Sequence, residues 1–395
     1  MKIGIYGGPF KPPHLGHLTA AAAVIATLKL DKLLLIPASI PPHKALPEGG
    51  ADAAQRLEMA TLATAELSCP AQVLDVEVRR QGKSYTADTL RTLRRQYPED
   101  ELWLLMGTDM FLSLQDWHEP QEILRLVRVA AFSRTGDPEQ QRFARQRAYL
   151  EKTFGAQVTV VENPHVVDIS STRLRQLLPE GREYLPEAVY GYILRQRLYG
   201  THAELKHLTP EELRPIALSF LKPKRMPHVL GTEQEAIRLA RRYGADETDA
   251  RIAALLHDCT KKLDMEQQLA LCRRYDIRLD GLEQHALKLL HAKTGAAVAR
   301  DIFGVKDAVY EAIRWHTTGK PDMTLLEKVI YLADYIEPNR DFPGVDELRR
   351  AVYDDLDKGL LMGLSDTIDE MERMGNPVHH DTLEARDFLL RGEAK

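Results

Sequence analysis

The sequence predicts two domains of different fold class: an α/β domain with a doubly wound parallel sheet, followed by an all-α domain. Three observations support this prediction. The 395 residues suffice for two domains of ordinary size. Short apolar runs alternate with helical stretches over about the first 200 residues, whereas later segments show only helical spacing. We expect residues 1–200 to form the first domain, 201–225 a linker and 226–395 the second domain.

The composition is that of a soluble globular protein. Hydrophobic residues make up 44% and charged residues 28%, and the net charge of -5 gives the whole molecule no attraction to nucleic acid. Cys69, Cys259 and Cys272 lack metal-type pairing, which is typical of a reducing compartment. The chain opens on a strand without a leader pattern, and no apolar run reaches membrane-spanning length. We therefore expect a cytoplasmic protein that binds no membrane, and a homo-oligomer stays open.

Six apolar runs predict the strands of the first domain. The second and fourth are apolar almost throughout, as is typical of parallel strands buried on both faces. The third alternates with polar residues, which indicates a more exposed position. Helical stretches lie between most of the runs, so we expect βαβ units with ligands at the carboxyl ends of the strands. The expected strands cover residues 2–8, 32–39, 71–80, 101–110, 128–134 and 158–164.

The first strand leads into a glycine turn, a proline-rich loop and two histidines. Gly7 and Gly8 let the backbone approach an anion, and the helix that follows offers N–H groups and a positive dipole end. His14 and His17 share one face of the first helical turn, where imidazoles can bind phosphates and balance charge during phosphoryl or nucleotidyl transfer. A glycine pair alone is common, but with Phe10 and His-x-Gly-His at this spacing it predicts a phosphate site.

Polar residues also follow other strands, where this fold places ligands. His43 and Lys44 follow the second strand, and Asp109 follows the fourth strand just after Gly107. These residues should meet the histidine motif at one edge of the sheet.

Three hydroxyl residues, Ser170, Ser171 and Thr172, precede a helical run after the sixth strand. Hydroxyls at a helix start are ordinarily N-caps. With Arg175 one turn into the helix, the same group also predicts a second anion cradle, and the two roles are compatible.

The first domain resembles the bacterial nicotinate-nucleotide adenylyltransferase family, Rossmann-like nucleotidyltransferases that make deamido-NAD from ATP and nicotinate mononucleotide. The matching segments span nearly all of residues 1–200: GGPFKPPHLGH, PPHK, SYTADTL, GTDMF with Trp117 after it, and DISSTRLR. The resemblance implies Mg²⁺ with ATP. It implies phosphate-binding and catalytic roles for His14, His17, Lys44 and Arg175, with substrate contacts from Gly7, Gly8, Phe10, Gly107, Arg134, Ser170, Ser171 and Thr172.

The same resemblance places Asp109 near the adenosine and Tyr85, Thr86 and Trp117 on the nicotinate side. A Trp face suits a pyridine ring, and a Thr hydroxyl with its backbone N–H suits a carboxylate. Two positions depart from the family: Pro9 replaces Thr or Ser, and Lys11 replaces Asp or Asn. Another acceptor, nicotinamide mononucleotide or phosphopantetheine, stays open.

The remainder of the chain has apolar residues at helical spacing and no convincing strand. Thr209 and Pro210 predict a helix start, with Thr as N-cap and Pro at the first helical position. Further helices are expected within residues 233–244, 248–263, 265–276, 282–304, 307–318 and 324–337.

Four histidines and two aspartates lie on or beside these helices, flanked by apolar residues. A lone buried histidine is ordinarily part of a core, but six such residues predict a metal site of imidazoles and hard carboxylates, suited to Fe, Mn, Co, Mg or Zn. Two metals bridged by an aspartate would supply a nucleophile and a phosphoryl clamp. The six residues are His228, His257, Asp258, His291, His316 and Asp334.

This pattern is similar to the HD-domain phosphohydrolases, and the strings HTTGKP and YLADYIEPNR resemble a bacterial HD family that hydrolyses diadenosine tetraphosphate to two ADP. The resemblance makes the six residues metal ligands, Asp258 also a catalytic residue, and iron the expected metal. Lys261, Lys262 and Arg340 become candidates to hold substrate phosphates, although the lysines also suit an ordinary surface. A nucleotide sensor without turnover is the alternative.

Overall fold

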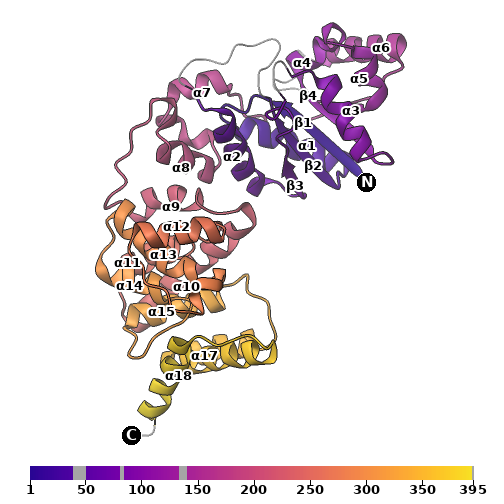
Figure 1. Cartoon of the computed structure of the whole chain (residues 1–395). Helices are drawn as coiled ribbons and strands as arrows, with labels where there is room; N and C mark the ends of the chain where they lie inside the picture. Colours follow the sequence, from indigo (N-terminus) through magenta and orange to yellow (C-terminus); the bar gives the residue numbers. More distant parts are fainter. Residues whose placement is uncertain (39–49, 81–83, 133–139, 394–395) are drawn as a thin grey trace. The chain divides into compact units, whose positions relative to one another are not determined.

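The structure is a computed structural model that divides the chain into two units, Met1–His202 and Ala203–Lys395, here called the front unit and the rear unit (Figure 1). Each unit is described by itself. The described residues are 1–38, 50–80, 84–132 and 140–393.

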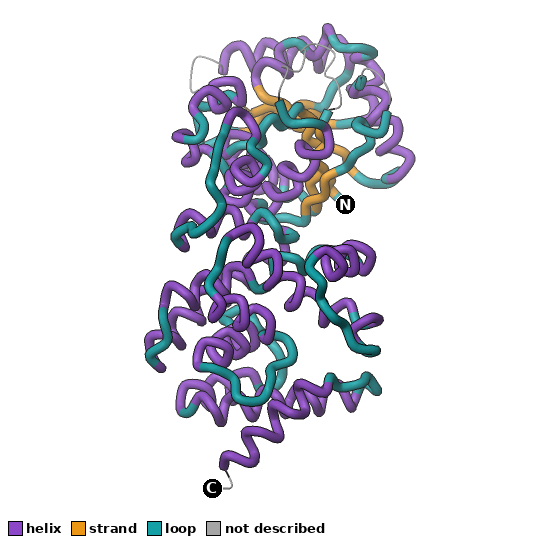
Figure 2. Tube along the Cα trace, turned by 60° about the vertical axis from the view of Figure 1, so that its left-hand side comes forward, coloured by secondary structure: helices purple, strands orange, loops and turns teal. Residues whose placement is uncertain are grey.

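Strands, orange in Figure 2, form the centre of the front unit. They make a six-stranded parallel sheet in the order β3-β2-β1-β4-β5-β6. The order reverses between β1 and β4, so the crevice that binds ligands in doubly wound folds lies at their carboxyl ends. The predicted fold class is confirmed. The strands are β1 (Lys2–Gly8), β2 (Lys32–Pro37), β3 (Ala71–Val73), β4 (Glu101–Gly107), β5 (Arg128–Phe132) and β6 (Val158–Val161).

Helices cover both faces of this sheet. Ile3 and Ile5 of β1 pack in one apolar cluster, whereas Tyr6 and Leu33 pack in the cluster on the other face. Burial on both faces explains why the strands read as apolar runs. The helices are α1 (Leu15–Leu28), α2 (Ala53–Ala63), α3 (Thr86–Gln96), α4 (Thr108–Leu112), α5 (Pro120–Leu126), α6 (Gln140–Phe154), α7 (Ser171–Leu177) and α8 (Glu187–Arg195).

Three predicted strands are too long, and the one expected over residues 158–164 ends at Val161. The strand expected over residues 71–80 ends at Val73. The N–H of Leu74 still bonds to the carbonyl oxygen of Leu35 at 2.9 Å, but Val76 packs against the core from a turn. The strand expected over residues 101–110 ends at Gly107, where α4 begins. A short helix that starts inside an apolar run has no separate periodicity by which to recognise it.

The rear unit is helical, with no strand among its described residues. The predicted helix start at Thr209 is confirmed: its hydroxyl accepts the backbone N–H of Glu212 at 3.4 Å, and Pro210 opens the helix. The helices are α9 (Pro210–Leu218), α10 (Met226–Tyr243), α11 (Glu247–Leu256), α12 (Met265–Arg274), α13 (Leu287–Phe303), α14 (Asp307–Trp315), α15 (Leu325–Ile336), α16 (Val345–Asp354), α17 (Leu356–Arg373) and α18 (His380–Glu393).

One helix boundary in the rear unit was predicted wrongly. The sequence places His228 before a helix that starts at residue 233, but α10 begins at Met226 and includes His228 in its first turn. Pro227 marks this start, since proline is tolerated in a first helical turn, where its missing N–H costs no bond. Within the part of the chain that the structure describes, no helix combines the length and apolarity needed to cross a bilayer.

Candidate functional site

The two motif histidines of the front unit lie together where β1 meets α1. His14 is the N-cap of α1, both side chains are buried, and the ring centroids are 3.7 Å apart. His17 Nδ1 accepts the backbone N–H of His14 at 3.2 Å, which leaves the ring proton on Nε2. In this tautomer the His17 Nε2–H can donate a hydrogen bond to an anion such as a phosphate.

The glycines of the motif keep the backbone open at this corner. A Cβ on Gly7 would meet no described atom within 4 Å, so the space beside this turn is open. A Cβ on Gly16 would lie 2.9 Å from the carbonyl oxygen of Val167, so any larger residue between the two histidines would collide with that backbone. Phe10, expected to contact substrate, has its ring in the core against Tyr6 and His17.

Side chains of α7 hold the proline-rich loop of the first motif. Arg175 Nη1 donates to the carbonyl oxygen of Lys11 at 2.8 Å, and Ser171 Oγ donates to that of Pro12 at 3.3 Å. Thus the two segments expected to bind phosphate are brought together, although about 160 residues separate them.

Ser170 and Thr172, at the start of α7, have different hydrogen-bond partners. Ser170 is the N-cap of α7 and accepts the backbone N–H of Arg173 at 3.2 Å, as the capping interpretation predicts. Thr172 Oγ1 accepts from Arg175 Nη2 at 3.2 Å. The second role, as an anion cradle, remains a prediction.

Arg56 is a residue of this corner that the sequence analysis missed. It lies on α2, is 1% exposed, and donates through Nη1 to the carbonyl oxygens of Pro9 at 3.1 Å and Ala38 at 2.5 Å. It therefore ties the loop after β1 to the end of β2. Lys11 is also buried, and burial with the nearby Arg175 and Arg56 cations lowers its pKa. The cation at the family's acidic position thus sits inside the loop rather than in solvent.

The residues expected on the nicotinate side lie at one helix start and in a loop. Tyr85 is the N-cap of α3, Thr86 is its first residue, and the Tyr85 ring lies 4.3 Å from that of His118, next to Trp117. The sequence analysis gave His118 no role.

Gly107 is the N-cap of α4 at the carboxyl end of β4, and Asp109 is exposed one turn later. Both therefore lie at the strand ends where the fold places ligands. His43, Lys44 and Arg134 lie outside the described residues.

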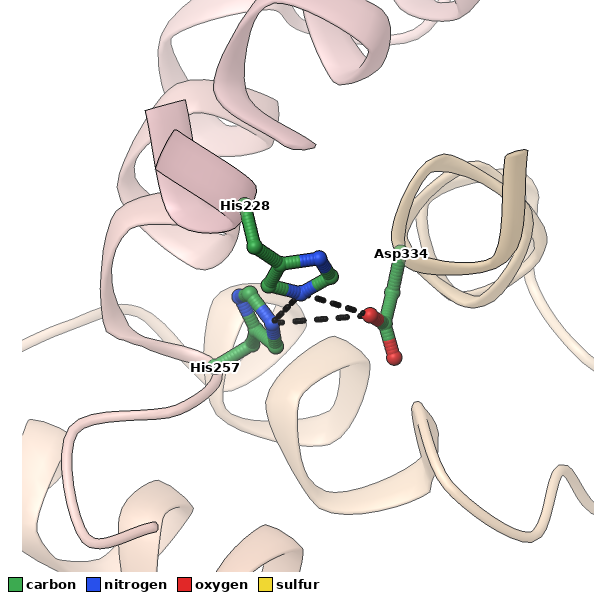
Figure 3. A group of neighbouring side chains, drawn as sticks. All are labelled: His228, His257 and Asp334. Atoms are coloured by element: carbon green, nitrogen blue, oxygen red, sulfur yellow. Dashed lines mark hydrogen bonds and ion pairs between the residues drawn. The ribbon is translucent and has the colours of Figure 1, made fainter. Parts of the chain in front are cut away.

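The rear unit brings all six expected metal ligands to one buried point. His228 Nε2 lies 3.4 Å from His257 Nε2 and 2.9 Å from Asp334 Oδ1, and Figure 3 shows these three side chains converging from separate elements. His291 Nε2 and His316 Nε2 are 3.1 Å apart. The side chains come from α10, α13 and α15 and from the residues directly after α11 and α14.

Asp258 lies between two groups of histidines and presents one oxygen to each. Its Oδ2 is 3.5 Å from His257 Nε2 and 4.0 Å from His228 Nε2. Its Oδ1 is 3.3 Å from His291 Nε2 and 4.0 Å from His316 Nε2. A carboxylate in this position can bridge two cations.

Hydrogen bonds on the far sides of the rings set the tautomers. His257 Nδ1 donates to the carbonyl oxygen of Ala254, and His316 Nδ1 to that of Ile313, each at 2.6 Å. The proton is thus on Nδ1, and the Nε2 lone pair faces the centre. Burial lowers the pKa of both imidazoles, which favours these neutral forms.

The carboxylates of this centre are ionised. Burial alone would raise the pKa of Asp258, but His257, His291 and Lys261 hold it well below its usual value. Likewise Asp334 is held well below its usual pKa by His228, His257 and Arg340, against the effect of burial. The imidazole Nε2 lone pairs, the buried carboxylate of Asp258 and the half-buried carboxylate of Asp334 form a donor set that fits divalent cations.

Positive side chains surround this centre. Lys261 Nζ lies 2.9 Å from His291 Nε2, and Arg340 Nη2 lies 2.7 Å from Asp334 Oδ1. Arg225, which the sequence analysis did not single out, places Nε 2.5 Å from Asp258 Oδ2. Arg225 lies three residues before His228 at the start of a helix, and residues three apart share one helix face. This spacing is the sequence signal that could have indicated Arg225.

Glu337 is a second residue that sequence reasoning missed. Its side chain is 1% exposed, and its Oε1 lies 3.1 Å from His228 Nδ1. Its Oε2 accepts the backbone N–H of Asn339 at 2.7 Å. A carboxylate behind a ligand histidine orients the ring and raises its basicity.

We expect Glu337→Gln to weaken metal binding about 10- to 100-fold, because the anionic acceptor behind His228 is lost while its shape is kept. Competition for Mn²⁺ between the protein and a chelating dye measures this affinity. Glu347→Gln, at an exposed glutamate on α16, is the matched control. Equal Mn²⁺ affinity in both variants and the unmodified chain would show that Glu337 does not contribute to metal binding.

Two family models match the chain, one in each unit. The Cytidylyltransferase-like model matches residues 5–177, and the HD domain model matches residues 225–339.

Individual relatives match each half over nearly their whole length. A probable nicotinate-nucleotide adenylyltransferase of Shewanella sp. strain MR-7 is 40% identical over 215 residues, covering 50% of this chain and 99% of the relative. A symmetrical bis(5'-nucleosyl)-tetraphosphatase of Halalkalibacterium halodurans is 42% identical over 183 residues, covering 44% of this chain and 95% of the relative.

A crystal structure described as a predicted HD superfamily hydrolase involved in NAD metabolism, from Clostridium acetobutylicum, is also similar. It is 42% identical, covers 47% of this chain and 98% of its own chain, and has a TM-score of 0.46.

Proposed function

The front half of the chain belongs to the nicotinate-nucleotide adenylyltransferase family and the rear half to the family of HD-domain symmetrical bis(5'-nucleosyl)-tetraphosphatases, and on that premise we propose a bifunctional enzyme. One unit transfers the AMP of ATP to nicotinate mononucleotide, giving deamido-NAD and pyrophosphate. The other hydrolyses diadenosine tetraphosphate to two ADP.

The transfer is supported above all by the joining of the histidine motif to α7. In the reaction, a phosphate oxygen of nicotinate mononucleotide attacks the α-phosphorus of ATP, and the bond to pyrophosphate breaks. His17 Nε2–H and the N-terminus of α1 bind the phosphates, and Arg175 and Ser171 hold the loop that shapes this site. Mg²⁺ bound with ATP supplies further charge neutralisation. Positioning and charge, rather than a covalent nucleophile, carry this chemistry.

Lys44 and Arg134 complete the proposed phosphate and substrate contacts, as the family resemblance implies. Gly7, Gly8 and Thr172 line the turns at this edge, and Gly107 and Asp109 are proposed to lie near the adenosine. For the nicotinate side we propose Tyr85, Thr86 and Trp117.

A direct test compares three acceptors with MgATP: nicotinate mononucleotide, its amide and phosphopantetheine. We expect pyrophosphate release to be fastest with nicotinate mononucleotide, since a Thr hydroxyl and backbone N–H groups suit its carboxylate. A preference for phosphopantetheine would contradict the assignment of this unit.

The hydrolysis is supported by Asp258, which faces two sets of imidazoles. The ions bound by these residues supply an activated water and a clamp for phosphoryl oxygens. Among the residues of the chain, Asp258 and Asp334 are the carboxylates that would hold these metal ions in place. Arg225, Arg340 and Lys261 are the cations proposed to bind substrate phosphates.

Product analysis distinguishes this enzyme from a nucleotide sensor. The metal-loaded chain should convert diadenosine tetraphosphate to ADP alone, whereas a sensor would leave it intact and an asymmetric hydrolase would release ATP and AMP. Iron as the natural metal, with Mn, Co or Zn as substitutes, and a cytoplasmic location remain predictions. The free thiols of Cys69, Cys259 and Cys272 favour such a reducing compartment.

A further inference from the structure

A second group of histidines and carboxylates lies in the rear unit, apart from the six-residue centre. Asp280, His379 and His380 each offer one atom, and these atoms lie within 4.8 Å of one another. Asp280 precedes α13 in a turn, whereas His379 and His380 stand at the start of α18. The group therefore joins segments about 100 residues apart in the chain.

The two distances from Asp280 to the histidines match those between ligands of one small cation. Asp280 Oδ2 lies 3.1 Å from His379 Nε2 and 3.5 Å from His380 Nδ1. Ligand atoms of a tetrahedral zinc ion are about 3.3 Å apart, given metal–ligand bonds of about 2.0–2.1 Å. Asp280 Oδ1 is already used, since it accepts the backbone N–H groups of Leu282 and Glu283 at 2.8 Å each. This division aims Oδ2 at both imidazoles.

His379 supplies an independent observation. Its side chain is 3% exposed, yet its Nε2 makes no hydrogen bond of acceptable geometry to any residue that the structure describes. Asp280 and Glu283 oxygens are 3.1 Å and 3.5 Å away but off the direction of the N–H. A buried ring nitrogen within ion-pair distance of two carboxylates, but without a well-aligned hydrogen bond to either, is uncommon in folded proteins.

The net negative charge around this group also favours the binding of a cation. Asp280, Glu283 and Asp381 contribute three carboxylates within 3.5 Å of an imidazole nitrogen, and Lys293, ion-paired with Glu283, is the ammonium in contact with them among the described residues. The group thus has more negative than positive charge before any ion is counted.

From this arrangement we infer a second metal site, in which Asp280, His379 and His380 bind a zinc-class divalent cation and fasten α18 to the turn before α13. His379 Nδ1 accepts the backbone N–H of Asp381 at 3.2 Å, so the metal-free ring holds its proton on Nε2. On binding, the ion takes Nε2 and the proton moves to Nδ1, whose N–H then donates to Asp381 Oδ2, 3.5 Å away, in exchange for the hydrogen bond that Nδ1 accepted from the backbone of Asp381. A carboxylate behind a ligand histidine is the usual support for such a ring.

The test counts the Zn²⁺ that the full chain retains after loading and desalting. His380→Ala removes a 60% exposed side chain, so folding should be unaffected, and Asp280→Asn keeps the cap of the turn while removing the anionic ligand. We expect each variant to retain one equivalent of Zn²⁺ less than the unmodified chain. His285→Ala, at an exposed histidine of the same segment, is the matched control and should lose none.

Hydrogen exchange of α18 provides a second measurement. Zn²⁺ should slow exchange of the α18 amides in the unmodified chain and in His285→Ala, but not in His380→Ala. Equal Zn²⁺ equivalents in all four proteins would overturn the proposed site, whatever the outcome for the hydrolase centre.

Discussion

Asp258→Ala should lower diadenosine tetraphosphate hydrolysis by about 10³-fold or more, equivalent to a loss of about 4 kcal/mol of transition-state stabilisation. Its two oxygens face different pairs of imidazoles, so one substitution removes a ligand from both halves of the centre. It also removes the nearer of the two carboxylates that pair with the Arg225 guanidinium, the other being Asp334 at 3.9 Å. Bound metal should fall together with activity.

Two controls keep this experiment decisive. Asp258→Asn preserves the packing of a fully buried side chain and should lose activity nearly as severely, with melting followed by circular dichroism. Asp369→Ala changes an exposed aspartate on α17 and should act like the unmodified chain. Hydrolysis within about twofold of the unmodified rate in a folded Asp258→Asn protein would show that the bridge is not needed.

His17→Ala should reduce adenylyl transfer by about 10²- to 10³-fold, because the Nε2–H donor aimed at developing phosphate charge is lost. The loss should appear mainly in kcat, since the interaction strengthens as charge builds in the transition state. Initial rates of pyrophosphate release over a range of ATP concentrations measure both kinetic constants. Hydrolysis by the same sample should stay unchanged.

His202→Ala is the matched control for this variant, because it removes an exposed histidine at the end of the front unit. It should leave both reactions unaffected. If His17→Ala lowered hydrolysis as much as transfer, the two sites would not be independent.

The sequence predicted the fold because burial leaves periodic signals. Leu33 to Ile36 form an unbroken apolar run since both faces of β2 are covered, and Thr209-Pro210 carries its capping chemistry locally. The third strand was overextended because Leu74, directly after the strand, and Val76, in the turn that follows, are apolar and pack against the core. A pattern of apolar residues indicates which side chains are buried, but it does not distinguish a strand from an irregular segment that is equally buried.

The candidate sites were predictable where a motif places functional groups close in sequence, or where histidines and aspartates recur on successive helices, as from His228 to Asp334. His14 and His17 belong to one helical turn, and their proximity follows from spacing. Arg56 binds a carbonyl 47 residues away, and Glu337 orients a histidine 109 residues away. Such partners are set by tertiary packing, for which a single sequence has no local signal.

The central claim, that one chain contains a metal-dependent site and a separate site that needs only MgATP, is tested most directly by stripping and restoring metal. The chain is dialysed against a chelator and freed of it, and then assayed for transfer with Mg²⁺ and ATP and, separately, for hydrolysis without added metal. We predict that transfer continues at its full rate, whereas hydrolysis is lost and returns when about two equivalents of Fe²⁺ or Mn²⁺ are added. Hydrolysis that persists in the stripped chain, or transfer that falls with it, would contradict this account.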